Sequence, residues 1–257
     1  MLELAPAGVE QVDGDGFVEY AIYGAPGELP ALPAGEADVG GVRVEVRAEP
    51  VPDDWSERWK RFHQPVLVGP ARTRGSAGER LWVRPPWAAP HEGALDLVID
   101  PGEAFGTGAH PTTRLSLELM LELKPRGSFA DLGCGSGVLA IAAALLGFRP
   151  VRAVDSEPAA LEATRRNAAA NGIELDRIER RNLRDEGPPA ADAIAANLTR
   201  PLLLRVAGLM EAQPRSLIVS GVLEDEADEV AAAFAPLTER RRLTSLGWSA
   251  MTLVPRL

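Results

Sequence analysis

The chain has 257 residues, of which 46% are hydrophobic and 25% charged, as is typical of a globular protein with a buried core. Its net charge of −10 opposes nucleic-acid binding, which depends on neutralising phosphates, and favours a basic protein partner. No apolar run approaches the roughly 20 residues that span a bilayer, no signal-peptide pattern is visible, and the single cysteine, Cys134, excludes an internal disulfide. We therefore expect a cytoplasmic protein, a monomer, with no nucleic-acid or membrane partner.

The first 94 residues predict short elements. Residues 1–50 are rich in glycine, proline and acidic residues and form one small region, and residues 51–94 form a linker. A helix is expected over 55–62, because its aromatic residues recur at helical spacing behind two aspartates. Strands are expected at 16–23, 41–48, 67–68 and 81–83, with a polar loop over 72–80.

From residue 95 to residue 257, strands of 4–8 residues alternate with helices. This alternation predicts an α/β domain with a doubly wound, mostly parallel sheet. A strand is expected at 95–99. The first strand of the sheet is expected at 128–132, and further strands at 151–154, 178–181, 191–196 and 216–220. Its helices are expected at 112–123, 138–146, 158–171, 201–210 and 225–234. Residues 243–246 and 248–254, on either side of Gly247, predict a closing antiparallel hairpin.

The sequence D-L-G-C-G-S-G over residues 131–137 predicts a tight turn between a strand and a helix. Gly133 and Gly135 let the backbone approach a ligand closely. The spacing G-x-G-x-G differs from the dinucleotide fingerprint and from the phosphate loop. Asp155 ends the next strand, where a carboxylate can accept hydrogen bonds from both hydroxyls of a ribose. The pattern resembles that of class I (Rossmann-like) methyltransferases, whose ligand is S-adenosylmethionine; the alternative is a plain turn whose glycines serve packing.

A second dense segment covers residues 100–113. Phe105 and Thr107 lie among small residues, which suggests a loop that folds over a ligand, and two threonines can cap the helix behind it. Because ligands bind beyond the carboxyl ends of parallel strands, we expect the glycine turn, Asp155, Asn182 and Asn197 at one edge. Asn197 would lie beside the transferable methyl; alternatively, it caps the following helix. The three histidines, 63, 91 and 110, are far apart and predict no metal site.

Three motifs carry a specific resemblance. D-P-G-x-A-F-G-T-G-x-H-x-T-T, D-L-G-C-G-S-G-V-L-A-I-A-A and A-N-L resemble the PrmA family, methyltransferases of the large-subunit ribosomal stalk protein L11, and residues 54–62 resemble its linker helix. The resemblance implies methyl transfer from S-adenosylmethionine to lysine ε-amines or the N-terminal α-amine of that protein. It implies that the cofactor is held by Thr113, Gly133, Asp155 and Asn197, and that the loop around Phe105 and Thr107 covers its methionine end. We expect Gly135, in the same turn, to contact the cofactor as well.

The chain departs from the family in two places. Glu103 stands where the family usually has Met or Leu. The family's N-terminal substrate-recognition domain is a small ferredoxin-like α+β unit, and residues 1–5 match part of its first helix. We therefore expect either that the domain is shortened here or that the true start lies upstream. Substrate identity therefore depends on the region that differs most.

The reaction predicted from this resemblance requires a neutral amine, and deprotonating a lysine at pH 7 costs about 4.6 kcal/mol. Burial lowers the pKa of an amine and alignment lowers the barrier, so no strong base is required. We expect Asn197 to orient the amine, and His110 either to accept a proton or to anchor its loop. Three alternatives stay open: a lysine methyltransferase for another basic protein, of the electron-transfer flavoprotein β-subunit type; an RNA methyltransferase; and a non-catalytic adenosylmethionine-binding module.

Overall fold

The computed structural model describes residues 10–14, 17–21, 35–39, 42–47, 63–69, 80–101, 110–124 and 127–256. The chain divides into two compact units, Met1–Glu57 and Arg58–Leu257. The helix expected over 55–62 lies outside the described residues. Among the helices that are described, none is long and apolar enough to cross a membrane.

The first unit contains two antiparallel hairpins. One pairs β1 (Glu10–Gly14) with β2 (Phe17–Ala21), and the other pairs β3 (Gly35–Val39) with β4 (Val42–Val46). β2 and β4 lie within the two strands expected from the sequence. β1 and β3 were not expected, because each is five residues long and includes acidic residues and glycine, which are depleted in strands. The ferredoxin-like arrangement of this unit stays a prediction.

A three-stranded sheet opens the second unit. It has the order β5 (Val66–Val68), β6 (Leu81–Arg84), β7 (Leu95–Val98), with β5 antiparallel to β6 and β6 parallel to β7. Leu81 and Leu97 are fully buried and belong to the same core cluster as residues of the large sheet. The small sheet therefore shares a hydrophobic core with the large one rather than forming a separate domain.

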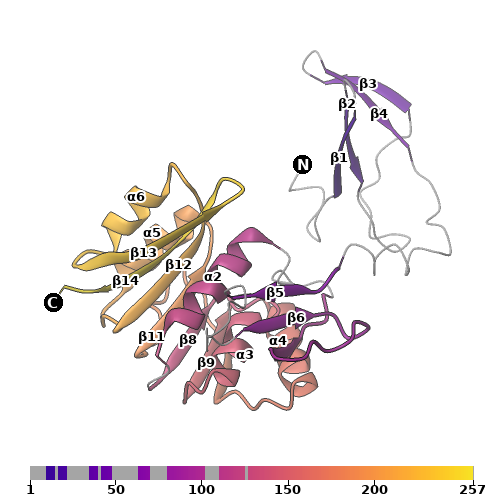
Figure 1. The fold of residues 1–257 in the computed structure, drawn as a ribbon. Coiled ribbons are helices and arrows are strands. Elements are labelled where there is room, and N and C mark those ends of the chain that lie inside the picture. Colours follow the sequence, from indigo (N-terminus) through magenta and orange to yellow (C-terminus); the bar gives the residue numbers. More distant parts are fainter. Residues whose placement is uncertain are drawn as a thin grey trace, which may run out of the picture. The chain divides into compact units, whose positions relative to one another are not determined.

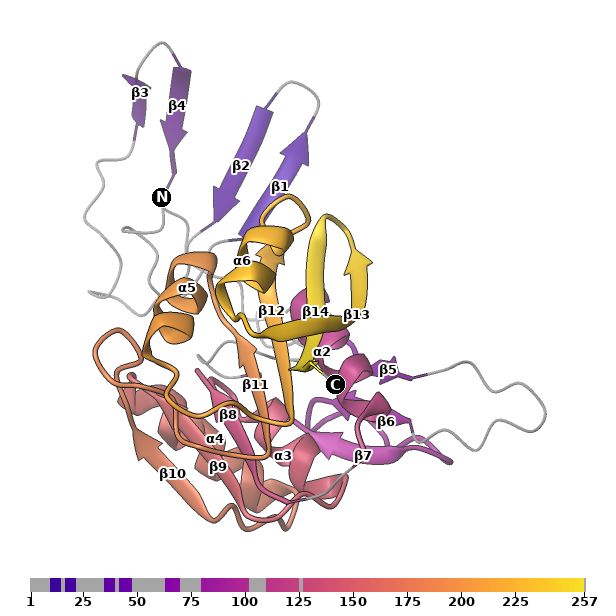
Figure 2. The ribbon, with the colours of Figure 1, turned by 90° about the vertical axis from the view of Figure 1, so that its left-hand side faces the viewer.

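The large sheet has seven strands in the order β10-β9-β8-β11-β12-β14-β13 (Figures 1 and 2). The bounds are β8 (Phe129–Leu132), β9 (Val151–Asp155), β10 (Arg177–Arg180), β11 (Ala193–Asn197), β12 (Ser216–Leu223), β13 (Leu237–Ser245) and β14 (Trp248–Pro255). The first five strands in this order are parallel, and β14 runs antiparallel to both β12 and β13. The predicted doubly wound sheet with a closing antiparallel hairpin is confirmed.

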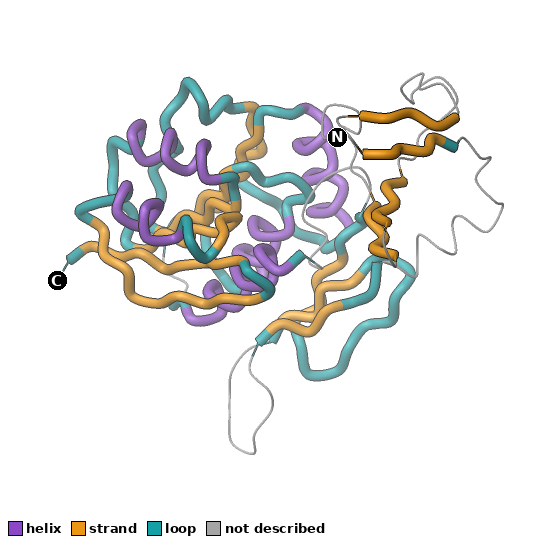
Figure 3. Tube along the Cα trace, turned by 90° about the horizontal axis from the view of Figure 1, so that it is seen from above, coloured by secondary structure: helices purple, strands orange, loops and turns teal. Residues whose placement is uncertain are grey.

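Helices cover both faces of this sheet (Figure 2). They are α2 (Pro111–Glu122), α3 (Val138–Leu145), α4 (Pro158–Ala170), α5 (Arg200–Leu209) and α6 (Ala227–Ala233). Side chains of α2, α3 and α4 join one buried cluster, and those of α5 and α6 join the other. Because side chains alternate along a strand, Phe129 of β8 faces the first cluster and Ala130 the second. The strands thus run between two layers of helices (Figure 3).

Two strand boundaries differ from the prediction by more than two residues. β13 begins at Leu237, well before the expected start at residue 243, because its charged stretch T-E-R-R-R forms a solvent-exposed edge strand. β12 continues past Ser220 to Leu223 through a register shift at Gly221. Gly221 has φ +87°, and a side chain there would overlap the Leu198 carbonyl, so this bulge requires glycine.

Candidate active site

The glycine turn lies between β8 and α3, as the sequence predicts. Gly133 and Gly135 have φ values of +70° and +52°, which other residues rarely adopt. The amide of Gly133 donates a 2.8 Å hydrogen bond to the carbonyl of Val154, so the turn is fastened to the end of β9. A Cβ at Gly133 would also overlap the side chain of Leu198, the residue that follows β11. The turn is therefore enclosed by the ends of both neighbouring strands.

Asp155 lies against this turn. Its Oδ2 accepts a hydrogen bond of 3.0 Å from the amide of Gly135, and its Oδ1 accepts one of 3.0 Å from the amide of Glu157. A carboxylate has about four acceptor positions. Two therefore remain for the hydroxyls of a ribose, and the carboxylate is already oriented by two backbone donors.

A second acid, Asp131, is buried beneath the turn and is 1% exposed. Its Oδ2 accepts a 3.0 Å hydrogen bond from the amide of Ala140, which ties the first turn of α3 to β8. Burial, together with the nearby charge of Asp155, raises the pKa of Asp131 to about 7. Asp131 is the first residue of the glycine motif, but the sequence pattern predicted no role for it. The feature that could have indicated one is an acidic residue near the end of a strand that is otherwise apolar and fully buried.

Cys134, inside the turn, is also buried, and its Sγ accepts a 3.2 Å hydrogen bond from Oγ1 of Thr164. Burial raises the pKa of this thiol. The thiol is therefore uncharged at neutral pH and has no nucleophilic character.

Thr113 and Asn197 form the other half of the site. They are 84 residues apart, yet Nδ2 of Asn197 donates a hydrogen bond of 3.4 Å to Oγ1 of Thr113. Asn197 ends β11, and Thr113 is fully buried in the first turn of α2. The position of α2 is fixed by Ser220 of β12, whose hydroxyl donates a 3.1 Å hydrogen bond to the carbonyl of Thr112.

His110 caps α2. Its Nδ1 accepts a 3.3 Å hydrogen bond from the amide of Thr112 and lies 2.8 Å from that residue's hydroxyl. The ring meets that of Trp248 edge to face, with centroids 5.2 Å apart. Burial lowers the pKa of His110, so its ring is neutral at pH 7.

The structure thus brings together most of the predicted cofactor residues at the carboxyl ends of β8, β9 and β11. Gly133, Gly135 and Asp155 form one group, and Thr113 and Asn197 the other, with Leu198 between them. Asn182 also lies at this edge, just beyond β10, where the amide of Arg181 donates a 2.9 Å hydrogen bond to the carbonyl of Asp155. Its own hydrogen bonds are made within its turn, to Arg184, Asp185 and Glu186. Phe105 and Thr107 lie outside the described residues, so their predicted role stays a prediction.

Residues 34–254 match the family model described as "Ribosomal protein L11 methyltransferase (PrmA)". The chain belongs to the PrmA family. Its relatives include the ribosomal protein L11 methyltransferase of Cupriavidus necator, 36% identical over 89% of this chain and 82% of the relative. The homologue from Azotobacter vinelandii is 41% identical over 78% of this chain and 70% of its own length. The solved ribosomal protein L11 methylase of Lactobacillus delbrueckii is 27% identical, with a TM-score of 0.58, and the match covers 71% of this chain and 97% of that one.

Membership of the PrmA family identifies the type of reaction as methyl transfer. The protein is an S-adenosylmethionine-dependent protein methyltransferase with the class I fold, as the resemblance implied. The residues present fit this cofactor, because the Asp155 carboxylate is held beside a glycine turn with acceptor positions to spare. The cofactor supplies an electrophilic methyl on a sulfonium; the protein must bind it and orient the attacking group.

Proposed function

We propose that this PrmA protein methylates ribosomal protein L11 at lysine ε-amines, at the N-terminal α-amine, or at both. Support comes from the names of the relatives, which specify ribosomal protein L11 and say nothing of the stalk. The net charge of −10 also suits a lysine-bearing partner. The structural observation that most supports the proposal is the hydrogen bond between Asn197 and Thr113, because it joins two of the predicted cofactor residues. Leu198, the next residue, lies against Gly133 of the glycine turn. The relatives of the chain indicate the substrate.

Asn197 is proposed to orient the attacking amine. Its Nδ2 bonds Thr113, which directs the same amide's Oδ1 away from that residue. An amide oxygen accepts an N–H of a neutral amine without stabilising the ammonium as a full charge would. The nitrogen lone pair can then be aligned with the methyl carbon. Alignment of this kind contributes on the order of 7–11 kcal/mol to lowering the barrier, more than the cost of deprotonating lysine.

His110 is proposed to anchor the start of α2. Its Nδ1 is already an acceptor for Thr112, so accepting a proton there would release the cap. Its lowered pKa also makes the ring a weaker base than an ordinary histidine. The alternative role, as proton acceptor, predicts that removing the ring lowers turnover rather than stability.

The test uses purified protein, labelled S-adenosylmethionine and three substrates in parallel: purified L11, another lysine-rich protein, and ribosomal RNA. We expect label in L11 alone, at amines identified by mass spectrometry. The Asp155→Ala variant is the negative control. Label in ribosomal RNA, or in the other protein with none in L11, would overturn the proposal.

We also propose that the protein acts as a cytoplasmic monomer, since its only cysteine is a buried thiol. Light scattering would measure its mass, and cell fractionation its location. A stable dimer or a membrane-bound pool would contradict this part of the proposal.

A further inference from the structure

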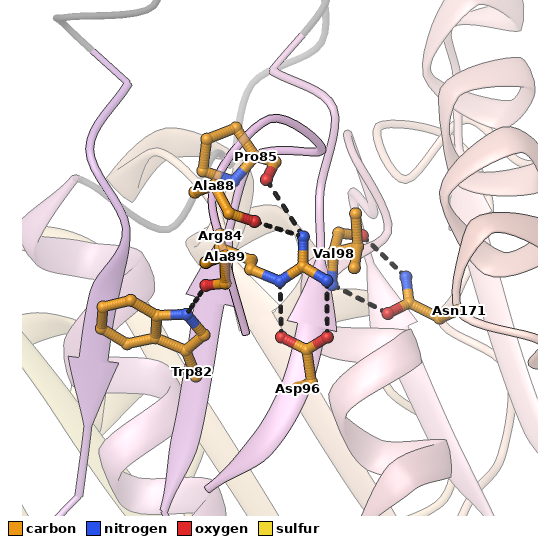
Figure 4. Close-up of polar contacts among 8 residues, drawn as sticks. All are labelled: Trp82, Arg84, Pro85, Ala88, Ala89, Asp96, Val98 and Asn171. Carbon is orange, nitrogen blue, oxygen red and sulfur yellow. Dashed lines mark hydrogen bonds and ion pairs between the residues drawn. The ribbon is translucent and has the colours of Figure 1, made fainter. Parts of the chain in front are cut away.

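Helix α4 and its C-cap carry two asparagines, Asn167 and Asn171, which are four residues apart and therefore share one face. Both bond the backbone around the end of β7. Oδ1 of Asn171 accepts a 2.8 Å hydrogen bond from the amide of Val98, and its Nδ2 donates one of 2.7 Å to the carbonyl of Val98 (Figure 4). Oδ1 of Asn167 accepts a 3.0 Å hydrogen bond from the amide of Asp100.

These hydrogen bonds fill one edge of the small sheet. β7 pairs with β6 on one side. On its other side it is an edge strand, whose backbone N–H and C=O groups could pair with a further strand. The two side-chain amides bind these groups in place of a strand. β7 is also held to β6 by Arg84, whose guanidinium makes two 2.7 Å hydrogen bonds to the carboxylate of Asp96 (Figure 4).

Asn167 makes one hydrogen bond that Asn171 does not. Its Nδ2 donates a 2.8 Å hydrogen bond to the carbonyl of Ser136, inside the glycine turn, and the side chain is nearly fully buried. Thr164, one turn earlier on α4, donates a 3.0 Å hydrogen bond to the preceding carbonyl of the turn, that of Gly135. The second amide hydrogen of Asn171 instead bonds the carbonyl of Asn167 in its own helix.

We propose that Asn167 is a positioning residue for S-adenosylmethionine binding. A single amide links Asp100, at the end of β7, to Ser136, in the turn that binds the cofactor. Asn167 thereby fixes the position of Asp100, from which the chain leads on to Thr113, relative to Gly133 and Gly135. Asn171 holds β7 to the same helix with the same kind of bonds but does not bond the turn. Its role is to attach the small sheet.

This difference makes Asn171→Ala a matched control for Asn167→Ala. Each variant removes one buried or half-buried amide from the same helix, and each releases the same strand. Affinity for S-adenosylmethionine is measured by titration calorimetry on folded protein, and the unfolding midpoint by thermal denaturation. We expect both variants to unfold at lower temperature. Only Asn167→Ala should bind S-adenosylmethionine more weakly, about tenfold, because both hydrogen bonds that fix the turn relative to β7 are removed.

A third variant, Asn167→Asp, tests the hydrogen bond to Ser136 directly. It keeps the shape and the acceptor for Asp100 but loses the donor. We expect its affinity to fall as in Asn167→Ala, and turnover at saturating S-adenosylmethionine to stay within about threefold of the wild type, because Asn167 does not touch the reacting atoms. Equal affinities in the Asn167 and Asn171 variants would overturn the proposal, as would wild-type affinity in Asn167→Asp. Since the readout is cofactor binding, the result does not depend on which protein is methylated.

Discussion

The helices on the two faces of the large sheet differ in what they bury. Helices α2 and α4 bury several polar side chains, those of Thr112, Thr113, Ser116, Thr164 and Asn167. Helices α5 and α6 bury only apolar ones, those of Leu203, Val206, Ala227 and Val230. Burying a polar group costs free energy unless the group is hydrogen-bonded. The fact that buried polar side chains gather on one face of the sheet therefore requires an explanation. Here most of these groups bond the segments that form the candidate cofactor site.

Variants at the candidate cofactor site, or at polar side chains that bond it, should therefore change cofactor binding. Variants on the apolar side, that of α5 and α6, should change stability alone. The largest expected effect is that of Asp155→Ala. This substitution removes the ribose acceptor and frees the amide of Gly135. We expect affinity for S-adenosylmethionine to fall about 100-fold or more, since each hydrogen bond to a charged group contributes roughly 1.5–3 kcal/mol. Calorimetry measures the loss, and Asp225→Ala, an exposed acid beyond β12, is the control. Unchanged affinity would remove Asp155 from the site.

Leu203→Ala probes the apolar side. Leu203 of α5 is fully buried, so the substitution leaves a cavity and should lower the free energy of unfolding by about 3 kcal/mol. Chemical denaturation measures this change. The folded fraction should bind S-adenosylmethionine within about twofold of the wild type. A large loss of affinity in Leu203→Ala would show that the two faces are not separable.

Asn197→Ala tests the orienting role. We expect kcat to fall about 100-fold, because a misplaced amine loses the benefit of alignment. Cofactor affinity should fall by no more than about tenfold, since the substitution removes only one hydrogen bond to Thr113, at 3.4 Å. Asn171→Ala, at an asparagine that attaches the small sheet, is the matched control and should retain wild-type turnover in the folded protein. If Asn197→Ala turns over normally with cofactor bound, its orienting role must be dropped.

Much of the candidate site could be predicted from the sequence. The glycine turn, Asp155 and Asn197 are local features at strand ends, and the rule for parallel sheets brings them to one edge. The helix predicted over 158–171 also ends where expected, at Asn171, and Gly172 follows in a left-handed conformation. The hydrogen bonds that connect these features join residues far apart in the sequence. The bonds of Asn171 and Asn167 to Val98 and Asp100 join residues 73 and 67 positions apart, and no local pattern indicates them.

The same reason explains the missed strand ends and the missed acid. The charged first half of β13 has no alternating pattern, because an edge strand with a solvated face needs none. Asp131 looks like any acid in a turn until burial and its bond to Ala140 are known. Sequence patterns thus predicted which residues gather at the edge of the sheet. They did not predict which residues hold those residues in place.

The smallest expected effect concerns His110, where the two proposed roles give opposite results. As a cap, His110→Ala should lower the free energy of unfolding by about 1 kcal/mol at pH 8 and leave kcat near the wild-type value. Because the pKa of His110 is lowered in the folded protein, the unfolded chain binds more protons as the pH falls through about 6.5. The stability that His110 contributes is therefore present above that pH and is lost below it. The difference between wild type and variant, measured by urea denaturation, should shrink from pH 8 to pH 5. A variant that keeps its stability but loses kcat would instead make His110 the proton acceptor.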